Sequence, residues 1–92
     1  MAVAFRVDER QSLIAAPKGW ESGDRRGNCM VWRKHGNWVW EITYHDERWD
    51  NPYELRLLRL AADGPATQVW TTAGRNWKEL VRVAEQREQT LS

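Results

Sequence analysis

CMVWRKHGNWVWEITYH, residues 29–45, carries the clearest structural signal in this 92-residue chain. Two runs rich in Val, Trp, Ile, Thr and Tyr, Cys29–Lys34 and Trp38–His45, flank a short segment that contains Gly36 and Asn37. β-branched and aromatic residues favour strands, and Gly and Asn accept the positive φ that a tight reversal needs. The stretch therefore predicts a β-hairpin.

The length of the hairpin loop determines which side chains share a face. A loop of Gly36 and Asn37 alone places Arg33 beside Trp40 and makes each face mixed. A three-residue loop that includes His35 gathers the large side chains on one face: Met30, Trp32, Trp38, Trp40, Ile42 and Tyr44. Because register follows the pattern that lets one face be buried, we expect the three-residue loop.

Further strands are predicted on both sides of the hairpin. In Ala2–Val7 the large apolar residues Val3, Phe5 and Val7 recur at every second position, which is the period of a half-buried strand. Residues 12–16 suit either a short strand or a single helical turn. After the hairpin, Glu54–Ala61 and Ala66–Thr72 have strand character, and the turn residues at 63–65 separate them.

The alternation of the strand at 54–61 breaks where two leucines, Leu57 and Leu58, are adjacent. A β-bulge inserts one extra residue into a strand and shifts which side chains point to each face. We therefore expect a bulge here that brings Leu55, Leu57 and Leu60 toward one side.

The last segment changes to helical spacing. Apolar residues recur along one side of a helix from about residue 77 to 89: Trp77, Leu80, Val81, Ala84 and Leu91. Asn76 is a favourable N-cap. Since only a sheet face is broad enough to cover this stripe, the sequence predicts an α+β fold, an antiparallel β-meander of four to five strands with one C-terminal α-helix packed on one face.

Length and composition indicate a single domain, residues 1–92, without strong long-range electrostatics. Fourteen basic residues against thirteen acidic ones give a net charge of +1, too small to gather nucleic acid or an anionic membrane from a distance. No apolar run is long enough to cross a bilayer, and no secretory signal is visible at the N-terminus. The single cysteine, Cys29, excludes an internal disulfide framework and favours the cytoplasm.

Catalytic and metal-binding patterns are weak. The expected register brings Cys29 and His45 onto one face, the minimum pair for nucleophilic catalysis, but no third orienting group is evident. Structural zinc sites need four nitrogen or sulfur ligands, usually in closely spaced pairs, whereas Cys29, His35 and His45 are scattered. The sequence therefore predicts a protein that is not an enzyme and has no metal or other cofactor.

A basic and aromatic surface is the remaining candidate site. Residues 18–28 contain three glycines and five charged residues, which predicts a flexible surface loop. Trp20 and Trp49 lie in polar segments where no periodicity drives them inward, so each ring is either exposed or folded back as a lid on the core. We expect the partner-binding residues to be Trp20, Arg25, Arg26, Arg33, Lys34, His35, Arg48 and Trp49.

These features favour a small binding module that docks to a protein, of the kind that serves as an inhibitor, immunity or adaptor protein, including those of phages and mobile elements. The alternative is a domain for single-stranded nucleic acid or RNA, in which the hairpin tryptophans stack on bases and its basic residues reach phosphates. Trp32, Trp38 and Trp40 are core or binding surface, and the sequence leaves both open. The near-zero net charge ranks the protein partner first.

Overall fold

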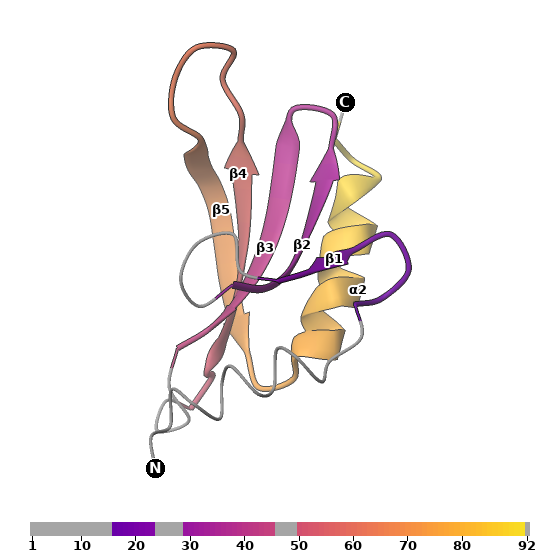
Figure 1. Cartoon of the computed structure of the whole chain (residues 1–92). Coiled ribbons are helices and arrows are strands. Elements are labelled where there is room, and N and C mark those ends of the chain that lie inside the picture. Colours follow the sequence, from indigo (N-terminus) through magenta and orange to yellow (C-terminus); the bar gives the residue numbers. More distant parts are fainter. Residues whose placement is uncertain (1–15, 24–28, 46–49, 92) are drawn as a thin grey trace.

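The computed structural model describes residues 16–23, 29–45 and 50–91. It confirms the α+β fold: a five-stranded antiparallel sheet with one C-terminal helix packed against it (Figure 1). The elements are β1 (Glu21–Ser22), β2 (Cys29–His35), β3 (Trp38–Tyr44), β4 (Tyr53–Arg59), β5 (Thr67–Gly74) and α2 (Trp77–Glu88). Strand order follows chain order, so the sheet is a meander. The strand expected at residues 2–7 and the segment 12–15 lie outside the described residues.

The β2–β3 hairpin has a two-residue loop of Gly36 and Asn37, so the prediction of a three-residue loop is wrong. His35 pairs with Trp38, and Arg33 pairs with Trp40. Gly36 has a φ of +60° whereas Asn37 does not have a positive φ, as in the type II′ turns that match the twist of hairpin strands. The sequence pattern misled because most of β3 is buried on both faces, so neither face had to be the polar one.

Helix α2 covers the main core. It begins after Asn76, whose side chain accepts a hydrogen bond of 2.9 Å from the backbone N–H of Lys78, as predicted for an N-cap. Its buried residues pack on apolar side chains from β2, β3 and β4; the core comprises Val31, Trp40, Ile42, Leu55, Leu57, Leu80, Val81 and Ala84. Within the described ranges, no helix is both long and apolar enough to span a membrane.

In the segment expected as a surface loop, residues 18–28, the described part, residues 18–23, contributes to the fold. Residues 24–28 lie outside the described residues. Glu21–Ser22 forms β1 and pairs with β2. Trp20 is only 5 % exposed and belongs to the core under the helix, and its indole Nε1 donates a hydrogen bond of 3.3 Å to Glu85. Of the two alternatives for this ring, the structure shows the lid on the core.

The sheet has a bulge near Leu57 and Leu58, but the extra residue lies in the neighbouring strand. Leu57 pairs with Trp70 and Leu58 with Gln68, so Val69 of β5 is the residue without an opposite partner. The alternation of β4 is therefore intact, and the prediction of a bulge that regroups the leucines of β4 is wrong. Leu58 is nevertheless buried, as are Val39 and Thr43 on the same face of the sheet, away from the helix.

Candidate functional site

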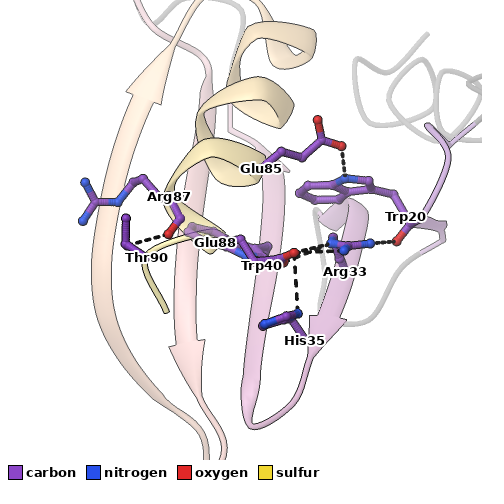
Figure 2. A network of polar contacts seen from close by, with 9 residues as sticks. Trp20, Arg33, His35, Trp40, Glu85, Arg87, Glu88 and Thr90 are labelled. Atoms are coloured by element: carbon purple, nitrogen blue, oxygen red, sulfur yellow. Dashed lines mark hydrogen bonds and ion pairs between the residues drawn. The ribbon is translucent and has the colours of Figure 1, made fainter. Parts of the chain in front are cut away.

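Glu88, near the end of α2, is the centre of a polar network that ties the helix to the hairpin (Figure 2). Its carboxylate accepts hydrogen bonds from Arg33 Nε at 3.0 Å and Arg33 Nη2 at 2.9 Å. The indole Nε1 of Trp40 donates a third bond of 3.1 Å, and His35 Nδ1 lies 3.5 Å from the carboxylate. The side chains of Arg33 and Glu88 are 28 % and 11 % exposed, so this two-point ion pair is partly shielded from bulk water, and its two parallel bonds fix its geometry.

This network holds Arg33 from two sides. The hydrogen bond from Arg33 lowers the pKa of Glu88 below its ordinary value of 4.5, and the same contact raises the pKa of Arg33. Arg33 Nη1 also donates a bond of 2.8 Å to the carbonyl oxygen of Gly19. The sequence predicts Arg33 as a partner-binding residue, but its guanidinium donates its hydrogen bonds to Glu88 and Gly19 of the same chain.

The structure does not bring the expected partner-binding residues together as one patch. Trp20 is buried, and Arg33 is bound to Glu88. Lys34 is exposed, but it lies on the face of the sheet away from the helix, whereas His35 is exposed on the helix side. The other predicted contact residues, Arg25, Arg26, Arg48 and Trp49, lie outside the described residues.

An aromatic and basic surface lies on the helix side of the sheet, near the β2–β3 turn and the end of α2. It comprises His35, Trp38, Arg59, Trp70 and Arg87, and we call it the distal surface. The sequence predicts His35 as one of its residues and leaves Trp38 open, but does not indicate the others. The guanidinium of Arg59 lies 5.2 Å from the centroid of the Trp38 ring, and that of Arg87 lies 4.0 Å from the centroid of the Trp70 ring. Both indoles are partly exposed, and both arginines are exposed.

Strand register and the helix end create the distal surface. Trp38 and Arg59 are direct partners across β3 and β4, so their side chains share a face. Trp70 rests edge-on against the buried Trp40 ring, with centroids 6.2 Å apart. Figure 2 shows Arg87 and Glu88 on opposite sides of the helix end, and Arg87 lies over Trp70 while Glu88 contacts β2.

A hollow of about 330 Å³ adjoins the distal surface at the hairpin turn, lined by His35, Gly36, Asn37, Trp38 and Arg59. The Arg59 guanidinium and an imidazole supply hydrogen-bond donors beside the flat Trp38 ring. Carboxylate and carbonyl oxygens are the groups that such donors bind. The distal surface therefore combines apolar contact area with directional polar contacts.

A second polar cluster lies on the other face, around a hollow of about 330 Å³. His45 Nε2 is 2.6 Å from Glu54 Oε1 and 3.4 Å from Thr43 Oγ1, and Thr71 donates a bond of 2.6 Å to Glu54. Partial burial alone raises the pKa of Glu54, but its bonds with Thr71 and His45 outweigh this and lower it. Because the hydroxyl and the carboxylate approach the same imidazole nitrogen, this is not the relay of a nucleophilic triad.

Cys29 and the possible metal-ligating side chains were the remaining candidates for chemistry in the sequence. Cys29 is fully buried, and its Sγ donates to the carbonyl oxygen of Val31 at 3.5 Å. Among residues 16–23, 29–45 and 50–91, no three His, Cys, Asp or Glu side chains are grouped to hold a metal ion.

Comparisons with known proteins give no indication of the function. No protein-family model, no curated protein and no solved structure matches the chain significantly. The distal surface, with its partly exposed indoles and its arginines, has the composition of a recognition site.

Proposed function

We propose that this chain is a small non-catalytic module of the cytoplasm that docks to a protein partner through the distal surface, in the manner of an inhibitor, immunity or adaptor protein. One observation carries the proposal: two partly exposed indoles on one face, each with an arginine guanidinium over its ring. Trp and Arg are among the residues that dominate the binding energy of protein interfaces.

Stacking on the indoles reduces the conformational entropy that the arginine side chains lose when a partner binds. An interface side chain with many rotamers loses roughly 0.5–1.5 kcal/mol when a partner immobilises it. The Arg87 guanidinium already lies 4.0 Å from the Trp70 centroid, so less of this cost remains. The N–H edge of a stacked guanidinium can still bind a carboxylate of the partner.

The same stacking ranks the nucleic-acid alternative second. Bases bind to single-strand sites by stacking on open aromatic faces, but Arg87 occupies one face of Trp70. Trp40, one of the hairpin rings that could serve as a platform, is fully buried. A net charge of +1 also provides little attraction for a phosphate backbone.

Capture of a partner tests the proposal. Tagged wild-type protein and the variants Trp38→Ala and Arg59→Ala are incubated with lysate of the native host, and bound proteins are quantified by mass spectrometry. We expect a partner that wild type enriches and both variants lose. Lys34→Ala is the matched control, because Lys34 is an exposed cation on the opposite face.

Two results would overturn the proposal. One is equal capture by wild type and both distal-surface variants. If Lys34→Ala alone loses the partner in that case, the contact lies on the opposite face. The other is binding of a fluorescent single-stranded oligonucleotide that weakens steeply with added salt and disappears in Trp38→Ala, which would replace the protein partner with nucleic acid. Circular dichroism of each variant confirms that the fold is retained.

A further inference from the structure

A groove of about 440 Å³ runs between the segment before β1 and α2, where its lining extends from Trp77 to Glu85. We call it the helix groove. Its apolar lining comes from Pro17, Trp77 and Val81, and its basic lining comes from Lys18, Lys78 and Arg82. None of these residues belongs to the distal surface, so the helix groove is a separate feature.

The floor of the helix groove is apolar and fixed by the core. Val81 is buried, and Trp77 is partly buried and packs against the core cluster. The ammonium group of Lys78 lies 6.0 Å from the centroid of the Trp77 ring, and the indole is partly exposed and lines the groove. An apolar side chain placed there would exchange water for indole and aliphatic contacts.

The rim of the helix groove is basic. Its cations, Lys18, Lys78 and Arg82, are all exposed. Glu85 is the one acidic side chain among the described lining residues, and it accepts the indole hydrogen bond of Trp20 at 3.3 Å. The charge of the described rim is therefore positive.

Lys78 lies at a place where a cation does not stabilise the helix. Lys78 lies in the first turn of α2, next to the N-cap Asn76. The helix dipole is positive at this end and favours acidic side chains there. A cation at this place adds to the positive field over the groove instead of offsetting it.

We propose that the helix groove binds an acidic segment of a protein, with one large apolar side chain on the floor of Trp77 and Val81 and carboxylates at the basic rim. Charge complementarity selects this occupant, because an acidic chain satisfies Lys18, Lys78 and Arg82 while the floor takes its apolar anchor. A volume of about 440 Å³ suits a few side chains. The proposal does not depend on docking through the distal surface.

Selection from a random peptide library tests the proposal. A displayed library is panned against immobilised wild-type protein, and the enriched peptides are synthesised and titrated by fluorescence anisotropy. We expect enriched peptides with an aromatic or aliphatic residue flanked by Asp or Glu. Reversal of two exposed rim charges in Lys78→Glu/Arg82→Glu should weaken binding by about tenfold or more, and added salt should weaken wild-type binding.

A matched charge reversal on the distal surface, Arg59→Glu, separates the two surfaces. We expect the selected peptides to bind this variant as they bind wild type. The proposal is overturned by enriched peptides without an excess of acidic residues, or by unchanged affinity for Lys78→Glu/Arg82→Glu. It is also overturned if Arg59→Glu removes binding, because the peptides then occupy the distal surface.

Discussion

The guanidinium of Arg33 on β2 and the carboxylate of Glu88 on α2 form a two-point ion pair, with Nε–Oε1 at 3.0 Å and Nη2–Oε2 at 2.9 Å. The same carboxylate accepts the indole hydrogen of Trp40, a buried donor that needs a partner. Glu88 thus neutralises the charge of Arg33 and accepts the hydrogen bond of the Trp40 indole, both on the core side of the hairpin. This explains how the two-residue loop, which places Arg33 beside Trp40, is compatible with a buried core.

Loss of the Glu88 charge should weaken the contact between helix and hairpin. We expect Glu88→Gln to lower the free energy of unfolding by about 1–3 kcal/mol near neutral pH, because Arg33 loses its charged acceptor. Urea denaturation followed by circular dichroism measures the change. Asp63→Asn, an exposed substitution in the turn between β4 and β5, should change stability by less than about 0.5 kcal/mol.

Acid should remove the same contribution from the wild-type protein. The pKa of Glu88 is lower in the folded protein than its ordinary value of 4.5. The ion pair therefore stabilises fully above the unfolded pKa, and its contribution is lost as pH falls below about 4.5 and through the folded pKa. We expect the stability difference between wild type and Glu88→Gln to shrink below about pH 5; a constant difference down to acid pH contradicts this.

The hairpin turn should depend on the backbone freedom of Gly36. A non-glycine residue in the left-handed region costs roughly 1–2 kcal/mol, and Gly36 has a φ of +60°. We expect Gly36→Ala to destabilise the protein by about that amount in thermal or urea unfolding. Gly64→Ala is the matched control, since Gly64 does not have a positive φ and an added Cβ would meet Ala61 Cβ at 3.9 Å, an ordinary contact. Equal effects of the two substitutions would contradict the assigned turn.

The core under α2 should be sensitive to cavities. Leu80 is 5 % exposed. It packs so closely against Gly74 of β5 that a Cβ added to Gly74 would lie 3.3 Å from a Leu80 methyl carbon. We expect Leu80→Ala to cost about 2–5 kcal/mol, the range for removal of a buried leucine side chain. Val69→Ala removes atoms from a side chain that is 50 % exposed and should cost well under about 1 kcal/mol. Differential scanning calorimetry compares the two.

The elements with local signals were predictable. The helical period from Trp77 and the N-cap Asn76 fixed α2 to within a residue or two, and the β-rich runs around Gly36 predicted the hairpin. β1 was missed because two residues inside a polar, glycine-containing segment have no period of their own. The register was predicted wrongly because it places the charge of Arg33 on the core side of the hairpin. The residue that neutralises this charge, Glu88, is far away in the sequence.

The candidate site was less predictable than the fold. Trp70 and Arg87 meet only through the packing of α2 on β5, so no spacing in the sequence reveals their contact. Polar neighbours suggested exposure for Trp20, but the ring is a lid because Glu85 on the helix accepts its N–H. His35 is the expected contact residue that the distal surface retains.

Fluorescence quenching should divide the described indoles into two classes. Trp20 and Trp40 are buried, whereas the other described rings are partly exposed: Trp32, Trp38, Trp70 and Trp77. Trp38 and Trp70 lie beside arginines, so iodide should quench their emission more strongly than caesium does. We expect Trp38→Phe and Trp70→Phe to reduce the fraction of emission that iodide quenches, and Trp40→Phe to leave that emission in place. If iodide quenches neither ring in the free protein, the distal surface is closed and docking through it is contradicted.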